Sequence, residues 1–277
     1  MLTRPRILVR RPSPRLADGE LTHLARAPVD ADLALRQWQG YVAVFVDRGW
    51  AVDEVEPADE HPDGVFVEDT VVVVDDLAVL TRPGVPSRTG EVDSTARAIA
   101  ALDAAGLGMQ VDRIEPPGTL DGGDVLKVGA VVYVGQGART NAEGVRQLAA
   151  LVEPRGRTVV PVPVTKVLHL KSGVTALPDG TVIGFAPLVD APDETMRPRP
   201  AGGSDRSALS PGLIVPERHG TAVVDLGDGA VVMSADAPRT ADLLRARGLD
   251  VVTVPVTEFE KLEGCVTCLS VRLRRPA

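Results

Sequence analysis

The feature of this sequence that most restricts its fold is a repeated pair of strand-like segments. Runs rich in β-branched residues, joined by Gly or Asp turns, recur at residues 66–82, 125–135, 169–185 and 222–234, and each pair predicts a β-hairpin. After most of them comes a polar stretch, then apolar residues at helical spacing, and then a short closing strand such as "TVVPVPV" or "DVVTVPV". The pattern therefore predicts a repeating ββαβ unit.

The two ends of the chain supply a fifth unit. The N-terminal segment follows the same order from its middle, with a helix that begins near Asp30 and a strand at residues 51–55. It lacks only the hairpin, and two unpaired runs remain, residues 6–10 and residues 268–273. Pairing these two runs would complete the fifth hairpin. We therefore expect five ββαβ units closed into a pseudo-fivefold ring.

Two segments depart from this pattern. Residues 190–211, where the fourth unit should have its helix, are rich in Pro, Gly and Asp and predict a surface loop inserted into the ring. Residues 111–118, "VDRIEPPG", are interpreted as solvated turns. The expected fold is α/β, and residues 1–277 are expected to form a single domain.

Charge and composition exclude several classes of function. The formal charge is -8 and the basic residues are scattered, so the chain lacks the basic stripe that a nucleic-acid backbone requires. No apolar run is long enough to span a membrane, and the N-terminus lacks the apolar core of a signal peptide. The chain has two cysteines, Cys265 and Cys268, which fits a reducing compartment. We expect a cytoplasmic protein without nucleic-acid or membrane partners, and the sequence leaves a homodimer open.

The ring would bring chemically active side chains together. Residues near the starts of successive hairpins are acidic, basic or nucleophilic: Glu68 and Asp69, Asp121 and Asp124, His169 and Lys171, and finally Cys268. If corresponding strand starts meet around one axis, then carboxylates, an imidazole and a thiol converge on one pocket. A cysteine nucleophile needs its thiolate favoured and a proton donor for the leaving group, and one histidine can serve the second need.

The carboxylates indicate the charge of the ligand. Several carboxylates in one apolar cavity repel each other unless a cation lies among them. A guanidinium fits best, because it is planar, presents several N–H donors and carries an electrophilic carbon. Arg88 and Arg139 follow the first strand pairs and could hold a carboxylate at the other end of the same ligand. The expected ligand is an arginine derivative.

Six sequence blocks, in order along nearly the whole chain, resemble the dimethylarginine dimethylaminohydrolases: "VFVEDTVVV", "RPGVPSR", "LDGGDVL", "ARTNAEG", "LHLKS" and "TCLSV". That family is similar to the arginine deiminases and amidinotransferases. The resemblance implies a five-bladed α/β propeller. It also implies hydrolysis of asymmetric dimethylarginine and monomethylarginine to citrulline plus dimethylamine or methylamine, with no cofactor and no metal.

The matching motifs also imply roles for individual residues. Cys268 resembles the nucleophile that forms a covalent thiouronium intermediate, His169 the group that protonates the departing amine and then activates water, and Asp121 the acid that orients this histidine. The implied substrate contacts are Glu68 and Asp69 at the guanidinium, with Asp69 favoured for the direct contact, Asp63 at the α-amine, Arg88 and Arg139 at the α-carboxylate, a carbonyl of Leu262, and a lid near Leu24.

Alternatives remain open. The same core residues would serve an arginine or agmatine-like deiminase, although chain length favours the hydrolase because the deiminases carry an additional helical insertion. A non-catalytic binder of arginine derivatives would be expected to lack the thiol or the histidine. The C-x-x-C of Cys265 and Cys268 also allows a redox pair or half a zinc site, but a strand follows it and no H-x₃₋₅-H partner exists. Cys265 is interpreted as a pocket wall or a bystander thiol.

Overall fold

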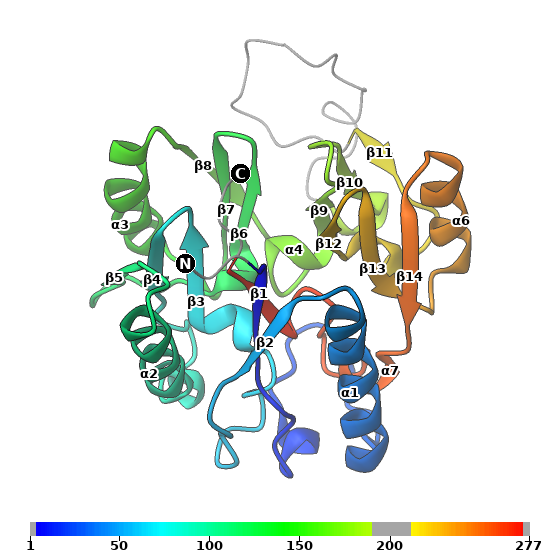
Figure 1. The fold of residues 1–277 in the computed structure, drawn as a ribbon, viewed down its shortest axis with the longest axis horizontal. Coiled ribbons are helices and arrows are strands. Elements are labelled where there is room, and N and C mark those ends of the chain that lie inside the picture. Colours follow the sequence, from blue (N-terminus) through cyan, green and yellow to red (C-terminus); the bar gives the residue numbers. More distant parts are fainter. Residues whose placement is uncertain (1–3, 190–211, 274–277) are drawn as a thin grey trace.

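The computed structural model describes residues 4–189 and 212–273, which form five three-stranded sheets around a common centre (Figure 1). In every sheet an inner strand pairs antiparallel with a middle strand, and the middle strand pairs parallel with an outer strand. The predicted five-unit α/β ring is therefore confirmed.

Each sheet follows the order inner, middle and outer strand. The strands are β15 (Ser270–Arg272), β1 (Arg6–Val9) and β2 (Ala51–Glu54); β3 (Val71–Val74), β4 (Leu77–Leu80) and β5 (Gln110–Arg113); β6 (Val125–Val128), β7 (Val131–Gln136) and β8 (Thr158–Pro163); β9 (Val174–Ala176), β10 (Val182–Gly184) and β11 (Leu213–Ile214); β12 (Val223–Gly227), β13 (Ala230–Ser234) and β14 (Asp250–Val254). The outer helices are α1 (Ala31–Asp47), α2 (Glu91–Ala104), α3 (Ala142–Val152) and α6 (Pro238–Ala246), and two shorter ones are α4 (Leu170–Gly173) and α7 (Thr257–Glu260).

The two ends of the chain meet as predicted. Strand β1 pairs antiparallel with β15, with Ile7 opposite Arg272, and this pairing completes the fifth sheet. The predicted solvated turn at residues 111–118 is wrong in its first part, because Gln110–Arg113 is the outer strand β5. All four residues of β5 are exposed, so the strand lacks the apolar alternation by which a half-buried strand is recognised. The predicted loop at 190–211 lies outside the described residues.

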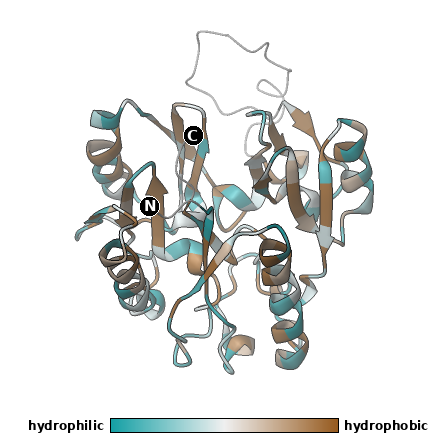
Figure 2. Ribbon diagram, viewed as in Figure 1, coloured by the Kyte–Doolittle hydropathy of each residue, from teal (hydrophilic) through white to brown (hydrophobic). Residues whose placement is uncertain are grey.

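Helix α1 shows how the outer layer is attached. The Asp30 carboxylate accepts a hydrogen bond from the Leu33 N–H and caps the helix at the predicted place. Tyr41 and Phe45, one turn apart, are fully buried, and Phe45 meets Trp50 edge to face. Figure 2 shows the strands as mainly hydrophobic, whereas the helices alternate hydrophobic and hydrophilic stretches. Each outer helix therefore buries one face against a sheet.

A short helical or tight turn precedes every inner strand. These turns are Val67–Thr70 before β3, Gly122–Asp124 before β6, α4 before β9, Arg218–Thr221 before β12 and, before β15, a turn closed by the Cys268 N–H on the Cys265 carbonyl. The polar residues predicted near the hairpin starts lie in or beside these turns, whereas Asp63, Arg88 and Arg139 come from other segments. Within the described ranges, no helix is long and apolar enough to cross a membrane.

Candidate active site

A small pocket lies where the turns before the inner strands meet. Most of the residues predicted from the sequence line it: Asp63, Asp69, Arg88, Arg139, His169, Leu262 and Cys268. They come from segments far apart in the chain, and the ring brings them together. Asp121 lies behind His169 rather than on the pocket wall.

His169 is held between carboxylates. It is 3% exposed, and its Nε2 lies 2.9 Å from Oδ2 of Asp121, while its Nδ1 lies 3.8 Å from Oδ1 of Asp69. Burial alone favours the neutral ring, but the charges of Asp69 and Asp124 and the hydrogen bond to Asp121 outweigh it and raise the pKa of His169 to about 9. The imidazole is therefore protonated at neutral pH and can donate a proton.

Two glycines allow the backbone to approach this histidine. A Cβ on Gly122 would lie 2.0 Å from the Glu68 carbonyl oxygen, and one on Gly123 would lie 2.7 Å from Nδ1 of His169. The Gly123 N–H donates a hydrogen bond to Oδ1 of Asp69. The glycine pair in "LDGGD" is therefore required by close packing against both neighbouring turns.

Asp121 is fully buried and well satisfied. Its Oδ1 accepts a hydrogen bond from the Gly84 N–H at 2.8 Å, and Nη1 of Arg139 lies 3.6 Å from its Oδ2. Among the described residues, Nη1 of Arg139 has no hydrogen-bond partner although it is buried. A buried donor left unpaired on a pocket wall indicates room for an acceptor from a ligand.

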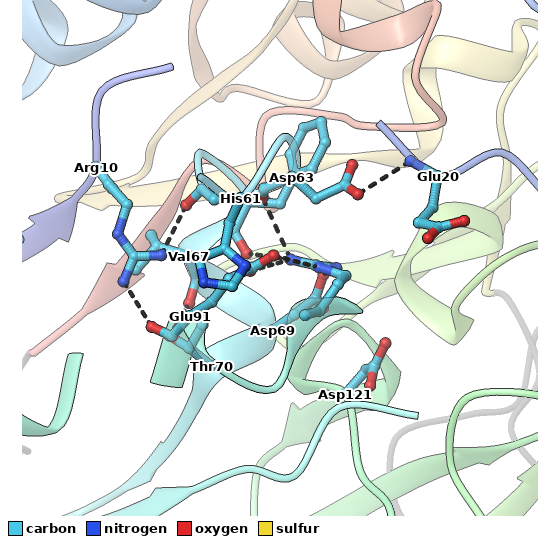
Figure 3. A network of polar contacts seen from close by, with 12 residues as sticks. Arg10, Glu20, His61, Asp63, Val67, Asp69, Thr70, Glu91 and Asp121 are labelled. Carbon is cyan, nitrogen blue, oxygen red and sulfur yellow. Dashed lines mark hydrogen bonds and ion pairs between the residues drawn. The ribbon is translucent and has the colours of Figure 1, made fainter. Parts of the chain in front are cut away.

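Asp69 and Arg88 also line the pocket, and Figure 3 shows part of the surrounding polar network. Nη1 of Arg88 lies 2.7 Å from Oδ2 of Asp69, while its Nε and Nη2 donate to the carboxylate of Glu91. Burial favours a neutral carboxyl, but the charges of His169 and Arg88 hold the pKa of Asp69 well below its usual range. Asp69 is therefore an anion in the pocket at any physiological pH.

The two cysteines lie side by side. Cys268 is 7% exposed and faces the pocket, and its Sγ lies 3.4 Å from Sγ of Cys265. The hydrogen bond with Cys265, burial and the nearby carboxylates raise the pKa of Cys268 well above its usual value. The hydrogen bond from Cys268 outweighs burial and lowers the pKa of Cys265 to about 6. These effects favour the thiol form of Cys268.

Besides Asp121, two predicted residues lie outside this pocket. The Glu68 side chain faces a separate cavity along the axis of the ring, where Nζ of Lys171 donates to it at 2.6 Å. Burial, only partly offset by Lys171, raises the pKa of Glu68 to about 7. Leu24 lines a third cavity, next to the pocket, whose wall also includes Cys265. Adjacent residues in a tight turn point in different directions, and Glu68 and Asp69 are an example.

One segment covers the pocket from the N-terminal side. The Asp63 carboxylate accepts a hydrogen bond from the Glu20 N–H at 3.0 Å. The Glu263 carboxylate accepts hydrogen bonds from the backbone N–H groups of Thr22 and His23. Residues 20–23 are thus attached at both ends to side chains from elsewhere in the pocket region.

Three supporting residues were not predicted from the sequence. Glu91 binds Arg88, and Arg10, which is fully buried, donates to the Glu91 carbonyl and to the Ser94 hydroxyl. Thr140 donates to the carboxylate of Asp124. Arg88 and Glu91 are three residues apart at a helix start, and this spacing is a usable sequence signal for Glu91. The sequence carries no such signal for Arg10, because its hydrogen-bond partners lie far along the chain.

A metal is not needed to satisfy this site. Asp69, Asp121 and His169 present ligand atoms within 4.8 Å of one another. All three are already paired with protein groups, Asp69 with Arg88 and Gly123 and the other two with each other. The carboxylate charges are balanced by the imidazolium and the guanidinium.

Comparison with known proteins gives the same picture. The N(G),N(G)-dimethylarginine dimethylaminohydrolase of Streptomyces coelicolor is 55% identical over 267 residues, or 96% of each chain. This chain belongs to the dimethylarginine dimethylaminohydrolase family. The Pseudomonas aeruginosa dimethylarginine dimethylaminohydrolase is 33% identical over 267 residues, covering 96% of this chain and 98% of that one.

Solved dimethylarginine dimethylaminohydrolases have the same architecture. A cysteine-to-serine mutant of the Pseudomonas aeruginosa enzyme complexed with citrulline has a TM-score of 0.82 at 32% identity and covers 96% of this chain and 98% of that one. A dimethylarginine dimethylaminohydrolase with a histidine-to-glycine mutation, in an adduct with S-methyl-L-thiocitrulline, has a TM-score of 0.82 at 31% identity, with the same coverage. The N-terminal domain of the cyanobacterial arginine dihydrolase ArgZ shares the fold, with a TM-score of 0.79 at 22% identity over 99% of this chain and 98% of that one.

A family model described as RNA-editing substrate-binding complex 5 protein matches residues 7–188, so the chain also belongs to that family. The matched part includes Asp69, Asp121 and His169, and it ends before the segment that carries Cys268. The two dimethylarginine dimethylaminohydrolase relatives, in contrast, match along almost the whole chain.

Proposed function

We propose that this protein hydrolyses Nω-methylated arginines, asymmetric dimethylarginine and monomethylarginine, to citrulline and dimethylamine or methylamine, with Cys268 as a covalent nucleophile and without a cofactor. The observation that carries the proposal is that a thiol, a protonated histidine and an ionised carboxylate share one buried pocket. A guanidinium is the ligand that all three groups can engage.

Binding of the substrate activates the nucleophile. The Asp69 carboxylate pairs with the guanidinium and places its carbon near Sγ of Cys268. The positive charge of the guanidinium favours the thiolate and so opposes the rise in the pKa of Cys268 that the hydrogen bond with Cys265, burial and the nearby carboxylates cause. The Cys268 proton leaves to solvent, and the thiolate then forms a bond to the guanidinium carbon.

His169 handles the protons of both half-reactions. The imidazolium donates its proton to the methylated nitrogen, and the C–N bond breaks. Dimethylamine or methylamine departs, and a thiouronium remains bound to Cys268. The neutral imidazole then takes a proton from water. The resulting hydroxide adds to the same carbon, and the C–S bond breaks to give citrulline and the free thiol. Asp121 fixes the orientation of the ring through its bond to Nε2.

The other end of the pocket binds the amino acid part of the substrate. We assign the α-carboxylate to Arg139, whose Nη1 makes no hydrogen bond within the described structure and has only the more distant ion pair with Asp121. Arg88 also lines the pocket and adds positive charge there while it holds Asp69. Asp63 is assigned to the α-amine and a carbonyl of Leu262 to a further contact, since both residues line the pocket. The segment near Leu24 acts as the lid.

We further propose that residues 1–277 work as one catalytic domain in the cytoplasm and that the partner is a small molecule rather than RNA. A formal charge of -8 opposes binding to a phosphate backbone. Glu68 contributes negative charge at the guanidinium end from behind the pocket, because its carboxylate is close enough to Cys268 to influence the thiol.

The deciding experiment measures citrulline, with identification of the amine product, from asymmetric dimethylarginine, monomethylarginine and free arginine side by side. We expect turnover of the methylated substrates and little from arginine. Ammonia released from arginine would instead assign the protein to the deiminases. Binding without turnover would make it a non-catalytic binder.

A paired substitution tests the identity of the nucleophile. Cys268→Ser should abolish citrulline formation while the far-UV circular dichroism spectrum stays unchanged. Cys265→Ser is the matched control, because it changes the neighbouring thiol and should largely spare turnover. If the two results were reversed, the nucleophile would be Cys265.

A further inference from the structure

The neighbouring thiols have a geometry that the proposed hydrolysis does not require. Sγ of Cys265 lies 3.4 Å from Sγ of Cys268, and these are the only two cysteines of the chain. Hydrolysis uses one thiol. A second thiol within bonding reach of the nucleophile needs a separate explanation.

The backbone between the two cysteines is already compatible with a disulfide. The Cys268 N–H donates to the Cys265 carbonyl at 3.1 Å and closes a turn of four residues. Such a turn holds its first and last Cα atoms within about 7 Å, which is near the upper end of the range that a disulfide spans. With the two sulfur atoms already in contact, rotation of the side chains would suffice for closure.

The two thiols open onto different cavities. Cys268 lines the substrate pocket, whereas Cys265 is half-buried and lines the neighbouring cavity beneath Leu24. The thiolate of Cys265 is favoured by hydrogen bonds from the Cys268 thiol and the Thr267 hydroxyl, which lower its pKa to about 6. Thiolate character and exposure determine which cysteine reacts with peroxides. A small oxidant therefore meets a reactive thiolate that is not the nucleophile.

We propose that Cys265 and Cys268 form a reversible disulfide that switches the enzyme off under oxidation and protects the nucleophile from irreversible damage. In the first step the Cys265 thiolate attacks hydrogen peroxide, the O–O bond breaks, and a sulfenic acid and hydroxide form. In the second step Cys268 attacks the Cys265 sulfur, the S–O bond breaks, and the departing hydroxide takes up the Cys268 proton. One peroxide and two thiols give one disulfide and two waters.

Formation of the disulfide is independent of the proposed function, and only the loss of activity depends on it. A disulfide occupies the sulfur that would attack the guanidinium, so activity must fall in proportion to the fraction of oxidised chains. A cellular dithiol restores both thiols by exchange. Disulfides in a reducing compartment are usually of this transient, sensing kind.

The test treats the purified protein with hydrogen peroxide and follows free thiols, intact mass and citrulline formation in parallel. For the natural sequence we expect both thiols to disappear together, the mass to fall by two hydrogens, activity to decline in step, and dithiothreitol to restore all three. In Cys268→Ser, dimedone should trap a sulfenic acid on Cys265, whereas the natural sequence should give little adduct because Cys268 resolves it.

Cys265→Ser is the second arm, with each sample compared with its own untreated activity. We expect slower inactivation, because the reactive thiolate is gone, and no recovery with dithiothreitol once Cys268 is oxidised further. The proposal is overturned if the natural sequence keeps both free thiols in peroxide, or if Cys265→Ser inactivates and recovers like the natural sequence. A protein without turnover can still be tested by thiols and mass, so failure of the proposed function is distinguishable.

Discussion

The charge on His169 follows from three carboxylates around one imidazole. The pH profile of kcat/KM reports the ionisation of the free enzyme. Its alkaline limb should therefore lie near pH 9, where His169 loses the proton that it is proposed to donate to the leaving amine. Asp124→Asn removes one of these charges without touching the pocket, so the limb should move to lower pH. Citrulline formation measured from pH 6 to 10.5 checks this. An unchanged limb would show that another group controls it.

The same shift links pH to folding. The pKa of His169 is raised in the folded protein, so its stabilising effect is fully present below about pH 6.5, its value in the unfolded chain, and is lost as pH rises through about 9. The free energy of unfolding in urea should therefore fall over this interval in the natural sequence. In His169→Asn this part of the fall should disappear.

Substitution of Gly123 tests how closely its turn must approach His169. A Cβ at this position would lie 2.7 Å from Nδ1 of His169, so Gly123→Ala must displace the ring. Misplacement of a catalytic group by about 1 Å can cost about 100-fold in rate, and we expect a loss of that order in kcat. Gly40→Ala, in α1 where nothing lies within 4 Å, is the control and should keep full activity.

Arg139 is assigned to the far end of the substrate. Removing a hydrogen bond to a charged group costs about 1.5–3 kcal/mol, so Arg139→Ala should raise KM roughly 10- to 100-fold while kcat changes little. Steady-state kinetics with asymmetric dimethylarginine measure this directly. A KM equal to that of the natural sequence would show that Arg139 does not bind the substrate.

At the scale of elements, hairpins and their order could be predicted because β-branched runs and Gly or Asp turns are local signals. Strand β5 was missed, since a fully exposed strand has no apolar side to reveal it. Asp69 was favoured over Glu68 for direct contact, but the directions of the two side chains depend on a single 3₁₀ turn, Val67–Thr70, and could not be derived from the sequence pattern. The resemblance placed both at the guanidinium, yet only Asp69 lines the pocket.

The loop after α7 is expected to hold the lid segment. Glu263 accepts hydrogen bonds from the Thr22 and His23 N–H groups, and Glu263→Ala removes both acceptors. We expect faster proteolysis within residues 20–26 and a higher KM, with the melting temperature nearly unchanged because these bonds are exposed. Limited trypsin digestion followed by mass spectrometry measures the first effect. Equal cleavage rates would mean that Glu263 does not hold the segment.

At the scale of the whole molecule, the ring depends on the pairing of β1 with β15. Deleting residues 270–277 removes β15 together with the buried Val271 and Leu273. If several kcal/mol are lost, the melting temperature should fall by about 10 °C or more, at roughly 2–4 °C per kcal/mol for domains of this size. Deleting only 274–277 is the matched control, because it leaves β15 in place. Similar curves for both deletions would argue against closure by β15.

The late position of β15 and Cys268 also affects when a chain becomes active. A ribosome makes the strands of the other four sheets before it reaches residues 268–272. Until then the emerging polypeptide has Asp69, Asp121 and His169 but lacks Cys268, the proposed nucleophile, and β1 has no inner neighbour. A nascent or prematurely terminated chain therefore cannot consume substrate. Under this assignment, activity in a cell extract counts only chains whose translation has passed Cys268.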